Sequence, residues 1–174
     1  MKLWKVILCL LLLESLPAGA ASIGSITEQV NAPPNIQRSN QNLQGAKGSG
    51  VEMNDAIRTA NGKVAITFDD STKVQVTENS KLVIDDFVYD SKKGSGKLSL
   101  NMAMGTVRYA SGQIAKNNPQ QVAINTPTAT VAVRGTDFTG TVDELGGSMF
   151  ILLPSCPNDG KVRRPGDEIG RAHV

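Results

Sequence analysis

The sequence VAINTPTATVAVRGTDFTGTV fills positions 122–142 and is the most regularly patterned stretch of the chain. Small and β-branched residues alternate with threonine on both sides of one Arg-Gly-Thr segment at 134–136. Such alternation is typical of strands with one buried face. Gly135 permits a positive φ or the close approach of another backbone. The stretch therefore predicts short strands over 121–125, 128–133 and 138–142, and Pro127 restricts the first of them to an edge or a strand start.

Comparable strands are predicted on both sides of this stretch. Residues 63–68 and 73–77 alternate apolar and polar side chains around a polar turn, which predicts a hairpin. Residues 98–104 have the same period of two, and the acidic pair at 85–86 predicts a bulge or bend within a strand over 81–89. About eight or nine short strands, with turns roughly every ten residues, predict an all-β fold. A short-stranded antiparallel roll or sandwich and a β-solenoid both fit that pattern.

The first 20 residues have the layout of a secretory signal peptide. Lys2 and Lys5 precede an apolar run at 6–13, and Ala18-Gly19-Ala20 provides a small-residue cleavage site. The run is too short for a stable membrane-spanning helix, although an uncleaved N-terminal anchor is the alternative. We therefore expect a periplasmic or secreted protein with no transmembrane span after cleavage.

The remaining chain divides into three parts. Residues 21–50 are rich in Asn, Gln, Ser, Gly and Pro, which predicts a flexible polar lead-in. Residues 51–153 hold the predicted strands, and 154–174 form a tail. The last seven residues, EIGRAHV, read like a translated sequencing adapter, so we expect an artefact at a truncated C-terminus; an ordinary polar tail is the alternative. Cys156 is then a single cysteine, which either lacks a downstream partner or is a free thiol.

The distribution of charge argues against a nucleic-acid partner. The whole chain has a formal net charge of +2, but residues 21–160 hold 12 Lys and Arg against 13 Asp and Glu, a balance of −1. Nucleic-acid binding depends on a basic patch or stripe that neutralises phosphates. No such stripe remains once the two ends are set aside.

Few residues carry catalytic or metal-binding chemistry. The only histidine, His173, lies in the suspect tail, so no Ser-His-Asp, Cys-His or histidine–metal site is expected. No Gly-rich loop follows a strand and opens a helix. We therefore expect no cofactor, no metal and no enzymatic activity. Carboxylates are the remaining candidates for a ligand or Ca²⁺, with turn formation as their more ordinary role; they are Asp69, Asp70, Asp85 and Asp86.

Arg134 is the most distinctive charged residue of the patterned stretch. It is predicted to share a strand face with Thr130 and Ala132. Its guanidinium has the shape to fork onto a carboxylate such as Asp137 or Asp70, or onto turn carbonyls. We interpret Arg134 as a latch at a strand bend, with an anion-binding site as the alternative.

The order of motifs along 51–152 is itself informative. A strand followed by Thr-Pro, a small-residue strand, Arg-Gly-Thr and an aromatic form the most specific block, which resembles that of the FecR domain family. The upstream segments at 57–62 and 64–72, and Gly105-Thr106-Val107-Arg108, are similar to the same family. The residues of the block that we expect to shape the fold are Thr126, Pro127, Arg134, Gly135, Thr136 and Phe138.

The resemblance implies an exported all-β domain with no agreed catalytic residues. Founding members of the family receive a signal from an outer-membrane receptor in the periplasm and regulate a σ factor through a cytoplasmic N-terminus. This chain departs from them because it opens with a signal-peptide pattern. The family's closing strands are also missing beyond Leu153, which agrees with the expected truncation.

Three hypotheses for function follow. We expect an exported, non-catalytic binding module with a protein or glycan partner in the cell envelope. An envelope signalling component related to σ-factor regulation is the alternative. A carbohydrate-active enzyme is the third, because glycoside hydrolysis needs only two carboxylates at a defined separation.

Overall fold

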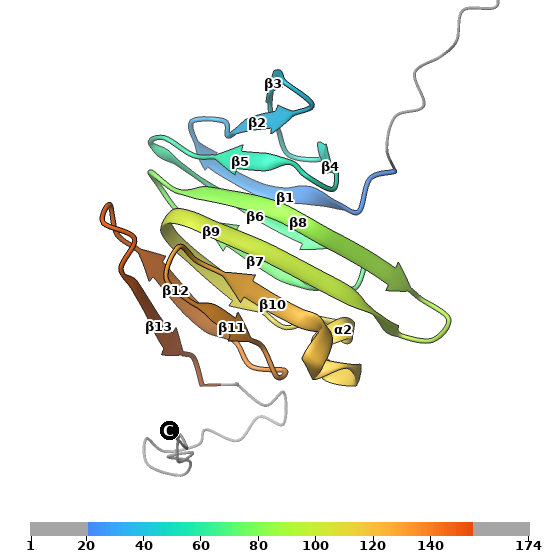
Figure 1. The fold of residues 1–174 in the computed structure, drawn as a ribbon. Coiled ribbons are helices and arrows are strands. Elements are labelled where there is room, and N and C mark those ends of the chain that lie inside the picture. The colour runs from blue at the N-terminus through green and yellow to red at the C-terminus, as the bar shows by residue number, and fades with distance from the viewer. Residues whose placement is uncertain (1–20, 155–174) are drawn as a thin grey trace, which may run out of the picture.

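Thirteen strands hydrogen-bond into one continuous sheet in the computed structural model, which describes residues 21–154. The strand order is β3-β2-β5-β8-β9-β7-β6-β1-β4, and the hairpins β10–β11 and β12–β13 are both attached to β9 (Figure 1). The strands are β1 Gly24–Asn31, β2 Asn35–Arg38, β3 Gln41–Gln44, β4 Gly50–Val51, β5 Ala56–Arg58, β6 Gly62–Phe68, β7 Lys73–Val76, β8 Lys81–Asp90, β9 Ser95–Ala110, β10 Val122–Asn125, β11 Thr130–Ala132, β12 Phe138–Val142 and β13 Ser148–Leu152. The expected all-β fold is confirmed.

The long strand β9 connects the two halves of this sheet. Its first part pairs antiparallel with β8 and parallel with β10, and its last six residues pair antiparallel with β7 and β12. The sheet therefore curls into a front half, which holds β3, β2, β5, β8, β10 and β11, and a rear half, which holds β4, β1, β6, β7, β12 and β13. Figure 1 shows β8 and β9 crossing in front of β6 and β7.

Gly105 is the point at which β9 passes from one half to the other. Leu98, Leu100 and Met102 face the core before it, and Val107 and Tyr109 face the core after it. The inward positions thus change from even to odd numbers, which a regular strand of period two cannot do. Gly105 absorbs this change with a φ of +86°, a conformation that other residues adopt only under strain. A Cβ atom at this position would also lie 2.6 Å from the Cα of Ser80.

Both halves of the sheet bury their aliphatic side chains in a single core. The stacked rings of Phe68 from the rear half and Phe87 from the front half lie 5.4 Å apart between centroids and join the two walls. The front wall includes Ile57, Leu82, Ile84, Leu98, Leu100, Met102, Val122 and Ile124, and the rear wall includes Ile26, Val64, Ile66, Val74, Val76, Val107, Tyr109, Phe138 and Val142. Burial of apolar area at about 25 cal/mol per Å² makes this core the main stabilising contribution.

A bulge in β8 carries the acidic pair at 85–86, as the sequence predicts. The register of β8 against β9 shifts between Ile84 and Asp86. Because the bulge inserts one residue, both Ile84 and Phe87 point into the core. Asp85 is left exposed and Asp86 half-buried on the outside of the sheet. The predicted hairpin of β6 and β7 is also confirmed, with Val64 opposite Val76.

The expectation of a flexible lead-in over 21–50 is wrong. The segment forms β1 to β4, and β1 pairs with β6 from Gly24 to Asn31. Its polar composition reflects an outward face, while Ile26 and Ile36 supply the core. The sheet therefore begins near residue 24 and not at 51. The expected signal peptide, Cys156 and the end of the tail lie outside the described residues.

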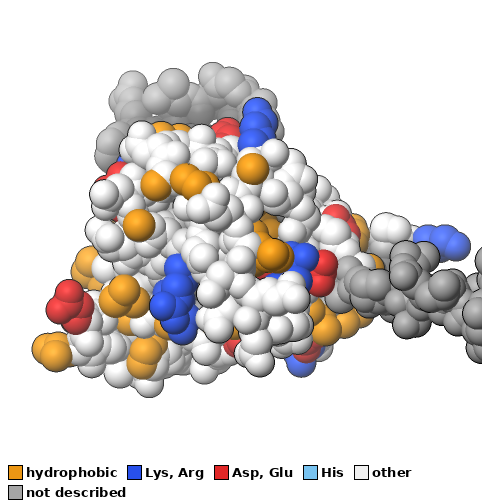
Figure 2. Space-filling view, turned by 90° about the horizontal axis from the view of Figure 1, so that it is seen from above, with side chains coloured by type: hydrophobic (Ala, Val, Ile, Leu, Met, Phe, Trp, Pro, Cys, Tyr) orange, Lys and Arg blue, Asp and Glu red, His pale blue; other side chains and the backbone are white. Residues whose placement is uncertain are grey.

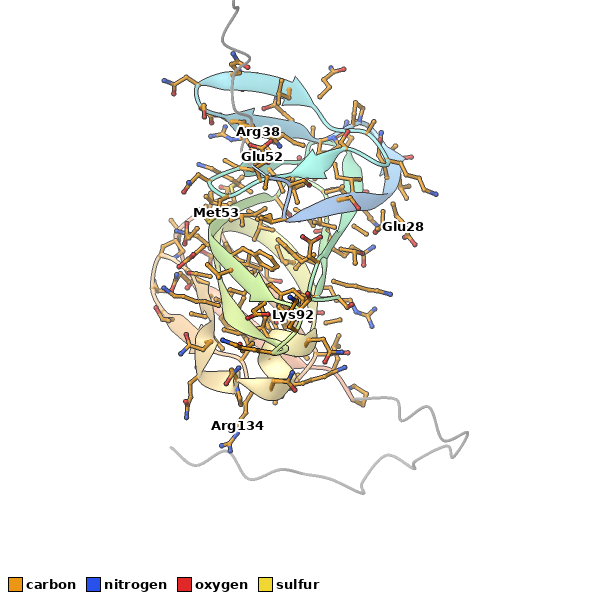
Figure 3. All side chains as sticks on the ribbon, turned by 90° about the vertical axis from the view of Figure 1, so that its right-hand side faces the viewer. Glu28, Arg38, Glu52, Met53, Lys92 and Arg134 are labelled. Atoms are coloured by element: carbon orange, nitrogen blue, oxygen red, sulfur yellow. The ribbon has the colours of Figure 1, made fainter. Side chains whose placement is uncertain are left out.

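A nearly buried ion pair fixes the β2–β3 hairpin to the rest of the sheet. The Arg38 guanidinium donates to both carboxylate oxygens of Asp55 at 2.7 and 2.8 Å and to Glu52 Oε1 at 2.6 Å. It also reaches the carbonyl of Gly50 at 3.0 Å. Asp55 is fully buried, and its hydrogen bond raises the pKa of Arg38 above the usual value. Figure 3 shows Arg38 and Glu52 side by side at the β2 end of the molecule.

Helical structure among residues 21–154 is short. Helix α2 spans Gln113–Asn117, and a 3₁₀ turn, η1, spans Pro119–Gln121. The sequence pattern did not predict α2, because five residues cannot show a helical period. Ile114 and Ala115 of α2 close one end of the core. Within the described part of the chain, no helix has the length and hydrophobicity needed to cross a membrane.

Replacing Gly105 with Ala tests the hinge in β9, with Gly135→Ala as the matched control. Both glycines have positive φ, but a Cβ at Gly135 meets nothing closer than 3.8 Å. The control should lose about 1–2 kcal/mol of unfolding free energy from backbone strain alone. Gly105→Ala should lose about 3 kcal/mol or more, because the overlap with Ser80 adds to that strain. Urea denaturation measures both; equal losses would contradict the role of Gly105 as a crowded hinge.

Replacing Arg38 with Met tests the ion pair with Asp55. The variant leaves a buried carboxylate without its cation, and the unfolding free energy should fall by about 3 kcal/mol. Lys97→Met is the matched control, because Lys97 pairs with Asp86 at 2.8 Å on the surface. Its loss should stay below about 1 kcal/mol. A similar loss in both variants, read from denaturant midpoints, would show that burial of the Arg38 pair is not what matters.

Candidate functional site

An open groove lies on the outer face of the rear half-sheet. It has a volume of about 390 Å³ and crosses β1, β6, β7 and the end of β9. Its lining consists of Thr27, Glu28, Ala65, Thr67, Lys73, Val74, Gln75, Arg108 and Ala110. Nearly all of these are the outward positions of strands whose alternate residues form the core.

Small and hydroxyl-bearing residues make the floor of the groove. Ala65 and Ala110 have the shortest side chains in the lining, so the surface is deepest where they lie. The hydroxyls of Thr27 and Thr67 lie 3.2 Å apart, and Thr27 also donates to the carbonyl of Ala65 at 3.3 Å. The register of β1 against β6 shifts between Ile26 and Glu28, and the consecutive residues Thr27 and Glu28 both line the groove. The floor thus offers hydroxyl groups to a bound molecule.

Two cations stand together on one side of the groove. Lys73 of β7 lies opposite Ala110, and Arg108 of β9 lies opposite Gln75. The two cations are therefore diagonal neighbours on the same face, a relation that places Cα atoms about 7–8 Å apart. Both side chains are exposed, and neither forms a salt bridge with another residue in 21–154. This side of the groove is suited to a negatively charged group.

The lining of the groove offers mainly groups that form hydrogen bonds and carry charge. Glu28 is the one carboxylate in the lining, and residues 21–154 contain neither histidine nor cysteine. Hydroxyl, amide, ammonium and guanidinium groups bind a ligand by hydrogen bonds and charge. On the face seen in Figure 2, acidic and basic side chains are interspersed and form no continuous basic patch.

Asp69 and Asp70 do not form a ligand site together. Asp70 is fully buried and accepts hydrogen bonds from the backbone N–H and the hydroxyl of Thr72, at 2.9 and 2.8 Å. It also accepts from the N–H of Ile114 at 3.3 Å, which ties the β6–β7 turn to α2. Asp69 is exposed beside it. Asp70 is thus a turn-forming residue, which is the alternative that the sequence left open.

Asp85 and Asp86 are separated from the groove by the core. They lie on the outer face of the front half-sheet, where Asp86 pairs with Lys97. No cluster of three or more carboxylates suited to a cation occurs among residues 21–154, so these four aspartates are not brought together.

Thr126 and Pro127 form the tip of the β10–β11 hairpin. The N–H of Thr126 donates to Ala129 O at 2.8 Å, and its hydroxyl accepts from the N–H of Ala129 at 3.1 Å. The same hydroxyl accepts a 2.8 Å bond from Ser148 at the start of β13. Pro127 lies in the turn after β10 has ended, and not within the strand. These residues hold the tips of two hairpins together.

Phe138 anchors β12 in the core, and Gly135 shapes the turn before it. Gly135 has a φ of +69°, as the sequence predicts. The Phe138 ring stacks on Tyr109 at 5.1 Å and meets Phe150 edge-on at 5.6 Å. Burial raises the pKa of Tyr109 to about 12; its hydroxyl lies near Thr72 and Ser111 without a hydrogen bond to any described residue.

Arg134 does not form the latch that we expected. Its side chain is exposed and points away from the domain (Figure 3), with no ion pair to Asp137, Asp70 or any other described carboxylate. The turn at Gly135 leaves Arg134 on the outward face while Val133 enters the core. Asp137 closes this bend instead, since it accepts from the N–H of Ser111 at 3.0 Å. The carbonyl of Thr136 accepts from the Ser111 hydroxyl at the same distance.

The sequence did not predict the groove, because the groove depends on which strands lie next to each other and in which register. The alternation of Lys73 and Gln75 with buried valines did mark them as outward residues. What places Lys73 beside Arg108, and Thr67 beside Thr27, is the register of β7 with β9 and of β6 with β1. Pairs so distant in sequence leave no local pattern.

One family model matches the chain. The model described as FecR protein matches residues 55–153, which is more than half of the sequence. The chain belongs to the FecR protein family. It is therefore a FecR-like protein related to envelope signalling. No curated protein and no solved structure matches it.

The matched part of the FecR domain does not include all of its sheet. Strands β1 to β4 precede residue 55, yet β1 lies between β6 and β4 within the rear half. The groove therefore combines Lys73 and Arg108 from the matched region with Thr27 and Glu28 from the segment before it.

Alanine substitutions at Asp137 and Arg134 separate the two candidates for the latch. Asp137→Ala leaves the N–H of Ser111 without its acceptor, and the unfolding free energy should fall by about 1–2 kcal/mol. Arg134→Ala removes an exposed side chain and should stay within about 0.5 kcal/mol of the parent. Thermal and urea unfolding measure both. A larger loss for Arg134→Ala would restore the original interpretation of that residue.

Proposed function

We propose that this FecR domain is an exported, non-catalytic interaction module whose groove binds an extended, negatively charged segment of a protein partner in the cell envelope. The observation that carries the proposal is the pair of exposed cations, Lys73 and Arg108, beside a floor of small and hydroxyl-bearing residues. Periplasmic or secreted location is part of the proposal and is supported by the signal-peptide pattern of residues 1–20.

An extended segment suits the shape of the groove. The groove follows the outer face of adjacent strands, whose backbone groups are already paired within the sheet. Specific contacts therefore come from side chains: hydroxyls of Thr27 and Thr67, the amide of Gln75 and the two cations. A polypeptide with acidic side chains supplies acceptors for all of them.

The lining favours a protein partner over a glycan or a catalytic role. Sugar rings pack their apolar faces on aromatic side chains, and the lining contains no aromatic residue. Hydrolysis of a glycosidic bond uses two carboxyl groups about 5–10 Å apart, whereas Glu28 is the single carboxylate in the lining.

A role as an envelope signalling component is the second candidate. The family match favours it, because the match covers the whole of 55–153. In that role the groove would receive the partner segment as the input of the signal. Deletion of the gene followed by measurement of transcript levels separates the candidates, since a signalling component changes a defined set of transcripts and a purely adhesive module does not.

Charge reversal in the groove tests the binding proposal. The probe is a ten-residue peptide of alternating Glu and Thr, titrated into the purified protein and followed by backbone amide chemical shifts. Residues of β6 and β7 should shift, and Lys73→Glu or Arg108→Glu should each weaken binding about tenfold, or about 1.4 kcal/mol. Binding should also weaken with added salt.

Lys92→Glu is the matched control, because it changes charge by the same amount in the exposed β8–β9 loop, away from the groove lining. Its affinity should equal that of the parent. Equal weakening by all three variants would show non-specific attraction only. Shifts in β6 and β7 with a uronic-acid oligosaccharide, and none with the peptide, would replace the protein partner by a glycan.

A further inference from the structure

The groove on the rear half-sheet is lined by two rows of outward side chains that cross the strands. The first row consists of residues that face each other from one strand to the next, and these are Glu28, Ala65, Gln75 and Arg108. The second row lies beside it and consists of Thr27, Thr67, Lys73 and Ala110. Together the two rows hold every residue of the lining except Val74.

The groove is longer across the strands than along them. Neighbouring strands lie about 4.8 Å apart, so the first row extends about 14 Å from β1 to β9. Along β6, β7 and β9 the two rows are separated by two residues, which is a distance of about 7 Å. A polypeptide that ran along the strands would therefore place only about two residues in the groove. An extended segment fits the groove when it crosses the strands.

The two ends of the first row carry opposite charges. Glu28 is exposed on the outside of β1 (Figure 3) and forms no salt bridge with another residue in 21–154. Arg108 lies at the other end, and Lys73 of the second row lies one strand nearer to β1. The neutral side chains of Ala65 and Gln75 separate the opposite charges. The groove thus has an acidic end and a basic end, and both ends are suited to a charged ligand.

An extended polypeptide reproduces the spacing of these charges with two of its own side chains. It advances about 3.3 Å per residue, and its side chains alternate between two faces. Residues four positions apart therefore lie on one face at a separation of about 13 Å, which matches the first row. A basic side chain then lies over Glu28, while an acidic one lies over Arg108 and within reach of Lys73. Residues three or five positions apart would face opposite ways, and residues two positions apart would span about half of the row.

We infer, on the basis of the proposed function, that the partner segment crosses the strands of the groove and carries a basic residue four positions from an acidic one. The segment can run in either direction, because both directions can place its cation over Glu28. A uniformly acidic segment would instead place a carboxylate over Glu28, and like charges at an interface are unfavourable. Glu28 is thus a specificity residue of the groove, which selects segments that carry both charges at the right separation.

Three ten-residue peptides of serine and threonine with added charges test the spacing. The first carries a lysine and a glutamate four positions apart, and it is made in both chain orders. The second has the same composition with the two charges adjacent, so that they point to opposite faces, and the third has threonine in place of the lysine. Each peptide is titrated into the purified protein and followed by the backbone amide shifts of β6 and β7. The first peptide, in its better order, should bind about three- to fivefold more tightly than the other two, which is the gain from one exposed ion pair.

Charge reversal at Glu28 tests the same contact from the side of the protein. A fourth peptide has glutamate in place of the lysine of the first and should bind the parent more weakly than the first does. Glu28→Lys should reverse this order, because its ammonium attracts the new glutamate and repels the lysine. Glu144→Lys is the matched control, since Glu144 is also exposed and lies in the β12–β13 turn, outside the lining. This control should keep the order of the parent.

The outcomes separate this inference from the proposed function. If the third peptide, or the peptide with adjacent charges, binds in the groove as tightly as the first, the proposed function stands and the inferred spacing is wrong. If Glu28→Lys and Glu144→Lys leave the same order of peptides, Glu28 does not contact the cation and the inference is overturned. If no peptide shifts the amides of β6 and β7, the proposed function is overturned and this inference with it.

Discussion

One strand, β9, has to pair with both halves of the sheet. β9 supplies backbone partners to β8 and β10 with its first part and to β7 and β12 with its last six residues. This sharing determines the two walls of the core, because the inward face of β9 changes at Gly105. It also determines the outside, since the second part of β9 places Arg108 beside the strand that carries Lys73. The positive φ of a single glycine is thus a condition for both the interior and the groove.

Local patterns in the sequence predicted local structure and little beyond it. The period of two located the β6–β7 hairpin and the first part of β9, and the acidic pair located the bulge in β8. The positive φ of Gly135 followed from residue type alone. Polar composition misled the interpretation of residues 21–50, because an outward-facing strand such as β1 is ordered by its hydrogen bonds to β6. The groove and the partners of β9 depend on distant pairing, which no window of sequence contains.

The residues that identify the family and the residues suited to binding occupy different parts of the molecule. Thr126, Pro127, Gly135 and Phe138 hold hairpin tips, a turn and a cluster of aromatic rings in place. The groove is built from outward positions of β1, β6, β7 and β9, where side chains change without cost to the core. A FecR domain can therefore keep its signature block while its outer face adapts to a different partner.

The topology also has a consequence for how the chain folds. The strands made before β9 form two separate groups, β3-β2-β5-β8 and β4-β1-β6-β7, and no hydrogen-bonded strand pair joins them. Before β9 pairs with both groups, each has an apolar face, and no backbone hydrogen bond between strands holds that face against the other group. Exposed apolar faces and unpaired edges of this kind are prone to aggregation. A chaperone is therefore most useful to this protein before β9 has paired with both groups.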